Sequence, residues 1–528
     1  MKTKVAVLLA SIVALDVVNV ANANPCDTDV DVVIIGAGYA GIGAAIAFER
    51  YNSRSEVTDP INYVILEAAY DPNTNAVRPG GRGYGQRWIA GGEGNPLFEF
   101  LWTRGNPIQL EQQQWSDIRT CTQAGPPTKP KGKICTEMQT NKFNNARSDW
   151  WNAYECLQEE VNDFIAGVSS DDRSITDTLS NVCNWPPTSA TLDEQYLREI
   201  LEWYDTEYEF SITNDVTGYT NYPLSAYQDF QDKDFYISNV KNGASIVEEL
   251  IQAYPGIQDH IYPQPRYVTA INWSTSPVAV TTAEETCLAP KVLVTVSQGV
   301  LSSGDITFVP PLSSTEANDK TQDMNDLFGI GDMPNYVEIQ LKFKERFWGN
   351  TQFIFLPKTS SYCRVWQSLD TGWANEFFPN SNVLVCALID DEFKDLLSGT
   401  PLSLSEADVN AYIIDPLKQA FGKTSLSDCK KREPPFAFDP RVDECDLFDD
   451  CCFRVFDTPG DPDLWHGSYS HSKVQAPGVD INEITLMYNN FMSPIPFNDP
   501  TGCSAGYPLT HSPSCCSGDN CRVHFAGK

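Results

Sequence analysis

A short glycine-rich segment near the N-terminus constrains the fold of this chain more than any other feature. Its glycines have the spacing G-x-G-x-x-G and are Gly36, Gly38 and Gly41. The apolar residues 31–35 precede them and the small residues 42–51 follow, an order typical of a buried parallel strand and a helix. A second apolar run, 63–66, ends in Glu67. The pattern predicts a strand–helix–strand unit.

This unit has the features of a dinucleotide site. Gly36 permits a tight turn, Gly38 lets the backbone approach a pyrophosphate, and Gly41 allows the helix to pack closely on the strand. The helix N-terminus offers unpaired N–H groups to the anion. Glu67, at the end of the second strand, is the expected acceptor for a ribose hydroxyl. The motif does not separate FAD from NAD(P), and a glycine-rich turn without a ligand is the simpler alternative.

The length and the charge of the chain limit its classes of partner. With 528 residues it suggests two domains or one large composite α/β unit. The formal net charge of −33 disfavours a nucleic-acid partner, because phosphate binding requires a positive field. The same charge attracts cations, including small amines, although it also serves simply to keep a protein in solution.

Several features indicate a secreted protein. Residues 1–23 read as a signal peptide, with a short basic start, an apolar stretch and a small-residue cleavage site. The even number of cysteines, sixteen, predicts disulfide bonds, whose pairing the sequence leaves open. Cys386 lies in an apolar run and is a candidate for a buried free thiol. No later segment reads as a membrane span, and no metal-site pattern is present.

The apolar periodicity predicts further elements along the chain. Helices are expected at 150–164, 193–210, 244–253 and 405–421. Strands are expected at 267–273, 278–282, 291–296, 336–343, 383–389 and 522–525. Residues 106–190 are an elaboration with four cysteines, and 498–521 form a loop rich in Pro, Gly, Ser and Cys. The predicted fold class is therefore α/β, an α+β composite around a Rossmann-like core.

Four segments in the N-terminal fifth of the chain carry a resemblance to a known family. They are Gly36–Gly41, Val64–Ala68, Gly80–Arg82 and Trp88–Leu97. In this order they resemble the flavin-containing amine oxidases, most closely the secreted polyamine oxidases. Further similar segments are Tyr208–Phe210, Val292–Leu301, Ile306–Pro310, Tyr336–Phe343, Phe347–Trp348, Asn382–Val385, Asp390–Glu392, Gly467–Ser470 and His524–Gly527.

The resemblance implies a two-domain protein that follows the signal peptide 1–23. A discontinuous, Rossmann-like FAD-binding domain would comprise residues 24–105, 236–330 and 441–528. A substrate-binding domain with a mixed sheet and helices would comprise 106–235 and 331–440. The implied activity is the oxidation of a polyamine of the spermine or spermidine type by FAD and O2. Its products would be an aldehyde, a smaller amine and hydrogen peroxide.

The resemblance also implies roles for individual residues. FAD would be held by Gly36, Gly38, Tyr39, Ala40, Gly41, Glu67, Ala68, Arg82, Trp88 and Val268. The residues proposed as catalytic are Tyr336, Glu338, Glu209 and Tyr469. Substrate contacts would come from Glu93, Glu209 and Trp465. The implied partners are a small amine and O2, without a metal, and the oligomeric state stays open.

The sequence departs from the family pattern in ways that keep other functions open. Glu338 stands where the family has a lysine that holds a water near the flavin, and Ala90 stands where polyamine oxidases have an acid or a histidine. The sequence ends at Lys528, before the family's last helix. A catalytically degenerate or truncated relative is therefore one alternative. A flavin oxidase of the L-amino-acid type is the second, and it would need an arginine for the substrate carboxylate.

Overall fold

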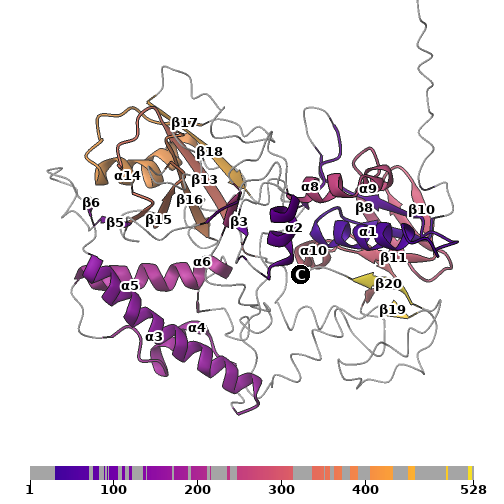
Figure 1. The fold of residues 1–528 in the computed structure, drawn as a ribbon, viewed down its shortest axis with the longest axis horizontal. Helices are drawn as coiled ribbons and strands as arrows, with labels where there is room; N and C mark the ends of the chain where they lie inside the picture. Colours follow the sequence, from indigo (N-terminus) through magenta and orange to yellow (C-terminus); the bar gives the residue numbers. More distant parts are fainter. Residues whose placement is uncertain are drawn as a thin grey trace, which may run out of the picture.

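The chain folds into two lobes, one around β11 (Lys291–Val294) and the other around β13 (Tyr336–Phe343), as Figure 1 shows. The structure is a computed structural model. It describes residues 26, 30–70, 75–81, 88–89, 92, 94–104, 110–112, 118–121, 135–137, 140–168, 172–187, 192–210, 214–215, 235–237, 246–312, 334, 336–349, 351–356, 362–370, 381–389, 405–431, 450–457, 495–496 and 521–525.

The first lobe contains a five-stranded sheet in the order β19–β20–β11–β1–β2. Its other strands are β1 (Val32–Ile35), β2 (Tyr63–Leu66), β19 (Ile495–Pro496) and β20 (Cys521–Phe525). The strands β2, β1, β11 and β20 are parallel, whereas β19 is antiparallel to β20. Both β1 and β2 are buried along their whole length, which explains why they read as continuous apolar runs. The predicted strand–helix–strand opening is confirmed.

The two faces of this sheet bury different partners. Ile34 and Ile65 pack under three helices, α1 (Tyr39–Asn52), α8 (Ile246–Ala253) and α9 (Gly256–His260). Val33 and Leu66 pack on the opposite face against a four-stranded sheet in the order β10–β9–β8–β12. These strands are β8 (Val268–Asn272), β9 (Val278–Thr282), β10 (Thr286–Ala289) and β12 (Thr307–Val309). Because successive side chains of a strand point to opposite faces, each short strand contributes to both cores.

The second lobe is built on an eight-stranded sheet in the order β17–β18–β13–β16–β15–β14–β5–β6. The strands around β13 are β5 (Ile118–Cys121), β6 (Cys135–Glu137), β14 (Phe353–Phe355), β15 (Val365–Ser368), β16 (Val383–Ile389), β17 (Lys430–Lys431) and β18 (Cys451–Asp457). Val337, Ile339 and Leu341 of β13 face one core of this lobe. The alternation of a strand therefore places Tyr336 and Glu338 on the opposite face of the sheet.

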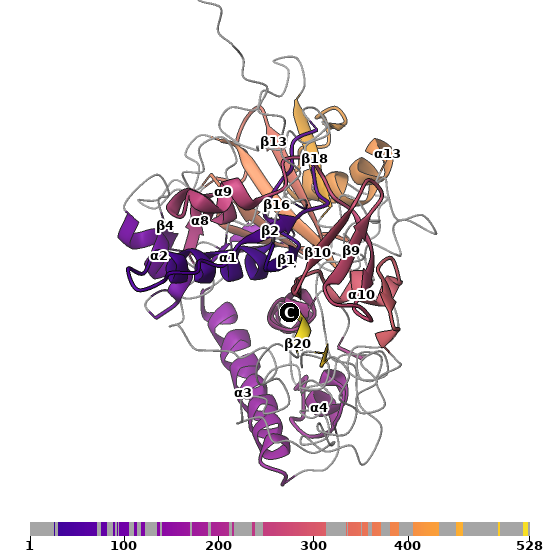
Figure 2. The ribbon, with the colours of Figure 1, turned by 90° about the vertical axis from the view of Figure 1, so that its right-hand side faces the viewer.

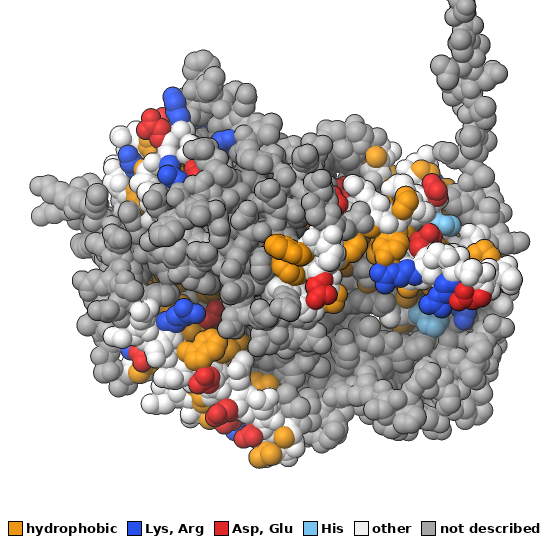
Figure 3. Space-filling model, viewed as in Figure 1, with side chains coloured by type: hydrophobic (Ala, Val, Ile, Leu, Met, Phe, Trp, Pro, Cys, Tyr) orange, Lys and Arg blue, Asp and Glu red, His pale blue; other side chains and the backbone are white. Residues whose placement is uncertain are grey.

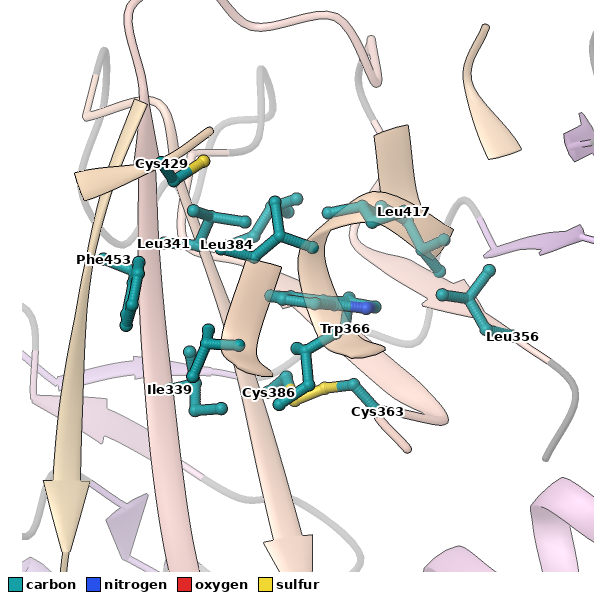
Figure 4. Packing of buried hydrophobic residues seen from close by; sticks show 14 of the residues in the cluster. Ile339, Leu341, Leu356, Cys363, Trp366, Leu384, Cys386, Leu417, Cys429 and Phe453 are labelled. Atoms are coloured by element: carbon teal, nitrogen blue, oxygen red, sulfur yellow. A yellow bond between two sulfur atoms is a disulfide. The ribbon is translucent and has the colours of Figure 1, made fainter. Parts of the chain in front are cut away.

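Three short helical segments cover the face of the sheet that carries Val337 and Ile339. They are α13 (Glu406–Val409), the π-helix η5 (Asn410–Ile414) and α14 (Asp415–Ala420). Figure 4 shows Trp366 and Leu384 packed in this core with Leu417 of α14. The predicted helix over 405–421 is confirmed in position, although its middle turn is wider than an α-helix.

Four helices lie on the other face of the eight-stranded sheet, below it in Figure 1, and Figure 2 shows two of them, α3 and α4, from the side. They are α3 (Thr140–Ile165), α4 (Ile175–Asn181), α5 (Leu192–Asp205) and α6 (Glu207–Phe210). Trp150 of α3 and Trp185 pack in their core with Phe353 of β14, and the two indole centroids lie 5.1 Å apart. The predicted helix 150–164 thus extends further at its N-terminal end, and the predicted helix 193–210 is divided into α5 and α6.

A small sheet and two short helices complete the described residues. The strands are β3 (Trp88–Ile89), β7 (Phe235–Ile237) and β4 (Leu110–Gln112), in that order, and the helices are α2 (Pro96–Arg104) and α10 (Gln298–Ser303). Trp102 of α2 is 61% exposed and stacks on Phe98, with ring centroids 5.5 Å apart. Figure 3 shows the resulting apolar surface over α2.

Two sequence-based expectations need correction. Cys386 is not a free thiol, because it forms a disulfide bond with Cys363, which lies two residues before β15, the strand that pairs with β16. The strand Cys451–Asp457 pairs with β13 and not with the sheet of β1, which moves it from the predicted FAD-binding segment 441–528 to the sheet of the predicted substrate domain. In both cases the partner is distant in sequence, and no local pattern specifies it.

The predictions about disulfide bonds, metal sites and membrane spans can be compared with the structure only within the described residues. Further disulfide bonds join Cys26 to Cys287, Cys156 to Cys183 and Cys429 to Cys451. Among the described residues no cluster of His, Cys, Asp or Glu is arranged to hold a metal ion. No helix within the described ranges is both long and apolar enough to cross a membrane. The predicted signal peptide, 1–23, lies outside the described residues.

A pH-dependent stability is expected from Asp205, at the C-terminal end of α5. Trp150 Nε1 donates to Asp205 Oδ2 at 2.5 Å. Burial raises the pKa of Asp205 to about 6, although the indole bond and the charge of Arg147 lower it. Because this value exceeds the ordinary pKa of an aspartate, about 3.9, the stabilising contribution is complete below about pH 4 and is lost as the pH rises through about 6.

We therefore expect the wild type to lose stability relative to Asp205→Asn between pH 4 and pH 7.5. The loss should be at most about 3 kcal/mol, since one pKa unit corresponds to about 1.4 kcal/mol. Urea unfolding followed by tryptophan fluorescence at both pH values measures it. Asp163→Asn, an exposed site on α3, serves as the control. A stability difference between wild type and Asp205→Asn that stays constant with pH would contradict the assignment.

Candidate functional site

The glycine turn between β1 and α1 has the tight geometry that its sequence predicts. Gly36 has a φ of +103°, and its N–H donates to Leu66 O at 2.8 Å. A Cβ atom on Gly36 would lie 2.8 Å from Thr295 Oγ1, and one on Gly41 would lie 1.9 Å from Gly36 O. Since real Cβ atoms essentially never approach closer than 3.0 Å, only glycine fits at Gly41 and Gly36.

The space in front of this turn suits a phosphate. A Cβ atom built on Gly38 would meet nothing within 4 Å. Gly38 is also the N-cap of α1, and neither a capping side chain nor an acidic residue of the first turn satisfies the first N–H groups. A helix of 14 residues that begins in this way presents its positive end to an anion. The turn therefore fits the pyrophosphate of a dinucleotide.

A second glycine-containing loop lies directly against the first. Gly80 N donates to Ala37 O at 2.9 Å, and a Cβ atom on Gly81 would lie 3.5 Å from the Cα atom of Gly38. Gly80 and Gly81 have φ angles of +124° and +53°, which glycine tolerates best. The predicted segment Gly80–Arg82 thus reaches the glycine turn, while Arg82 itself lies outside the described residues.

Glu67 occupies the end of β2, where the sequence predicts the ribose acceptor. Its carboxylate accepts hydrogen bonds from Ala37 N at 2.6 Å and from Ala69 N at 2.8 Å. Burial raises the pKa of Glu67, whereas backbone N–H groups, including that of Ala68, and the charge of Arg78 lower it. A carboxylate has about four acceptor positions, so Glu67 keeps capacity for a ribose hydroxyl. The ribose role stays a prediction.

Arg78 is a candidate that the sequence analysis missed. Its N–H donates to Ala69 O at 2.9 Å, and its charge acts on Glu67. A permanent cation beside the turn can pair with a pyrophosphate, as was expected of Arg82. Its place two residues before the pair Gly80-Gly81 was the available signal.

The remaining predicted FAD contacts have different environments. Val268, buried at the start of β8, follows closely on Arg266, whose N–H donates to Glu67 O at 2.7 Å. The side chain of Tyr39 packs both against Ile89 and Leu101 and against the core beneath α1. Tyr39 and Ala40 are the first two residues of α1, so the contact expected of them is through their backbone N–H groups. The backbone of Trp88 lies in β3, paired with Tyr236.

The face of β13 opposite its core carries the predicted catalytic residues Tyr336 and Glu338. Tyr336 and Tyr208 of α6 share a hydrogen bond between their hydroxyl groups, 2.6 Å long. Glu338 is half-buried and accepts a hydrogen bond from Gln340, two residues further on the same face. This face therefore combines a carboxylate with a pair of tyrosines, groups that can hold a water molecule or a cationic amine.

A buried arginine that the sequence analysis did not identify lies near this face. Arg364, 4% exposed at its side chain, is 3.8 Å from the carboxylate of Glu207 of α6. Its guanidinium carbon is 5.2 Å from the ring of Trp203. The arginine was missed because its partners lie in two helices, α5 and α6, more than a hundred residues earlier in the chain.

Several predicted site residues cannot be placed. The backbone of Glu209 lies in α6, but its side chain is outside what the structure describes. The other residues outside the described ranges are Arg82, Ala90, Glu93, Trp465 and Tyr469.

The comparisons with known proteins agree with this geometry. Residues 266–455 match the family described as "Flavin containing amine oxidoreductase". The structure is similar to a putrescine oxidase bound to putrescine, with a TM-score of 0.57 and 14% identity over 95% of this chain and 93% of that one. It is also similar to the cyclohexylamine oxidase of Brevibacterium oxydans IH-35A, with a TM-score of 0.53 and 14% identity over 95% and 93%. A comparison of the sequence with curated proteins gave no match.

The fold, the matched segment and the glycine turn agree with one another. The segment 266–455 begins at Arg266, beside Glu67, and includes β13, so it joins the dinucleotide turn to the face that carries Glu338. The turn and the open position at Gly38 suit the pyrophosphate of a dinucleotide. The chain therefore has the fold of the flavin-containing amine oxidoreductases and carries that family's pattern in residues 266–455, and its glycine turn suits the pyrophosphate of a dinucleotide such as FAD.

Proposed function

We propose that this protein is a secreted amine oxidase that uses FAD and O2 to oxidise polyamines of the spermine or spermidine type. The observation that carries the proposal is the glycine turn at Gly36–Gly41, closed by Gly80 and Gly81, in an amine oxidoreductase fold. The products would be an aldehyde, a smaller amine and hydrogen peroxide.

The chemistry divides between the cofactor and the chain. When bound, FAD supplies the acceptor for the hydride that leaves the amine carbon. The residues of this chain bind and orient the amine. Tyr208 and Tyr336 hold each other through their hydroxyl groups, so their rings form a fixed aromatic wall that can face an ammonium group. Glu338, which accepts a hydrogen bond from Gln340, would hold a water molecule near these tyrosines.

The charge of the chain supports a polycationic substrate. A net charge of −33 creates a long-range field that speeds the arrival of cations and repels anions. The disulfide bonds Cys26–Cys287 and Cys156–Cys183 support secretion, since such bonds persist mainly in oxidising compartments.

The L-amino-acid alternative fits less well. Such a substrate needs a cation for its carboxylate, but Arg364, the buried arginine near the β13 face, already lies beside the Glu207 carboxylate. Glu338, on that face, would repel a carboxylate. The degenerate alternative is favoured by Glu338, in place of the family's lysine, and by Ala90, in place of the acid or histidine of polyamine oxidases.

An absorbance experiment tests the proposal and separates the alternatives. We expect the purified protein to show flavin bands that bleach when spermine or spermidine is added without oxygen. Admission of air should restore the bands and release hydrogen peroxide. L-Leucine serves as the matched control and should leave the bands unchanged. Bleaching by L-leucine alone would favour the amino-acid oxidase, and bands that persist with every amine would favour the degenerate relative.

A further inference from the structure

A short segment after α9 crosses the carboxyl end of β2 and forms backbone hydrogen bonds with it. Ile261 forms a parallel bridge with Ile65, and Tyr262 N donates to Ile65 O at 2.9 Å. Four residues later, Arg266 N donates to Glu67 O at 2.7 Å. Glu67 is therefore fixed on two sides, through its carboxylate by the glycine turn and through its carbonyl by Arg266.

The side chain of Arg266 is itself held in a largely buried pair. Its Nε donates to Glu285 Oε1 at 2.8 Å, and the two side chains are 10% and 13% exposed. The guanidinium carbon lies 4.0 Å from the centroid of the Tyr262 ring, and Nη1 donates to Pro265 O at 2.9 Å. Together these contacts fix the orientation of the guanidinium group.

The partner carboxylate is anchored in the other sheet of this lobe. Glu285 lies in the turn between β9 and β10, where Thr282 N donates to Glu285 O at 2.8 Å. Thr282 Oγ1 also accepts from Glu285 N at 3.1 Å. The ion pair thus joins the end of β2, in the five-stranded sheet, to the turn of the four-stranded sheet.

We propose that Arg266, fixed by Glu285 and Tyr262, is a positioning residue for the adenosine half of FAD. Arg266 positions two residues that are expected to contact the adenosine half of FAD. Glu67 receives its backbone bond, and Val268 follows two residues later in the same segment, at the start of β8. Arg266 acts through these two residues and does not itself need to touch the cofactor.

The pair is sensitive to substitution because both charges are shielded from water. Removal of one partner leaves the other charge buried without compensation. Lysine cannot replace arginine here, because the planar guanidinium both binds the carboxylate through Nε and stacks on the Tyr262 ring. Loss of the pair should release the segment and let Glu67 and Val268 shift together.

Calorimetric titration of the apoprotein with FAD and with ADP tests the proposal. ADP carries the adenosine and pyrophosphate but no flavin, so it reports the adenosine half alone. We expect Arg266→Met and Glu285→Gln each to raise the dissociation constants for FAD and for ADP about tenfold, since a hydrogen bond to a charged group is worth about that factor. The double variant should be no worse than the poorer single variant, since both substitutions act on the same Arg266–Glu285 interaction.

Arg50→Met is the matched control on the same lobe. Arg50 also binds a tyrosine, with Nη2 2.7 Å from Tyr254 Oη and the guanidinium carbon 5.5 Å from its ring, but it is exposed at the C-terminal end of α1. Its substitution should leave both dissociation constants unchanged.

Two results would overturn the proposal. In the first, the Arg266 and Glu285 variants melt at lower temperature but bind FAD and ADP within twofold of the wild type. In the second, FAD affinity falls while ADP affinity does not, which would place the effect at the flavin end. If Arg266→Met does not fold, Glu285→Gln, which keeps the size and an acceptor oxygen, gives the same reading.

Discussion

Gly41→Ala should abolish FAD binding, with a dissociation constant raised at least about a hundredfold. The added Cβ atom would lie 1.9 Å from Gly36 O, a backbone atom that no side-chain rotation can move away. Gly36 cannot yield either, because its N–H is bound to Leu66 O and its carbonyl accepts from Thr295 Oγ1 at 3.1 Å. The helix must therefore move off the strand, which removes its N–H groups from the pyrophosphate.

The same helix provides the control for this experiment. Gly43 lies two residues further along α1, is exposed, and its Cβ atom would meet nothing within 4 Å. Gly43→Ala should bind FAD normally and stabilise the protein by up to about 1 kcal/mol, the difference in helix propensity between the two residues. Flavin fluorescence quenching gives the affinities. Normal binding by Gly41→Ala would show that Gly41 does not pack directly on Gly36 O.

The glycine turn was predictable because its constraints are local. A tight turn, a helix start and a strand end lie within six residues of each other, and each has a known sequence requirement. The faces of β13 were predictable for a similar reason, because alternation alone separates Ile339 from Glu338. In both places the structure depends on residues that are close together in the chain, and such features can be predicted from a sequence.

The contacts that the sequence did not reveal join distant residues. Cys386 pairs with Cys363 only because β15 and β16 are neighbours, and the strand at Cys451 joins the substrate sheet through a pairing that no local pattern encodes. In the sequence Arg266 has no feature that distinguishes it from other arginines, and its partner Glu285 is identified only by the fold. The role of a single polar residue depends on the residues that it contacts, and the order of the strands and helices in the fold determines those contacts.

Glu338→Lys should raise the rate of flavin reduction by polyamine at least about tenfold. By the family resemblance this position lies near the flavin, where negative charge develops as the amine is oxidised. A carboxylate there disfavours that charge, and a lysine favours it. The half-buried position on β13 makes the effect larger than at the surface, because burial limits screening by solvent.

A graded series separates this electrostatic effect from a change of shape. Glu338→Gln keeps the size of the side chain and removes only its charge, so its rate should fall between those of the wild type and Glu338→Lys. Lys342→Gln changes a charge on the same face four residues away, about 13 Å along the strand, and should have no effect. Stopped-flow bleaching without oxygen gives the three rates directly. The opposite result would be a rate that is highest in the wild type, lower in Glu338→Gln and lowest in Glu338→Lys, with FAD bound in all three. In that case the carboxylate takes part in the reaction, and Glu338 is a functional replacement for the family's lysine.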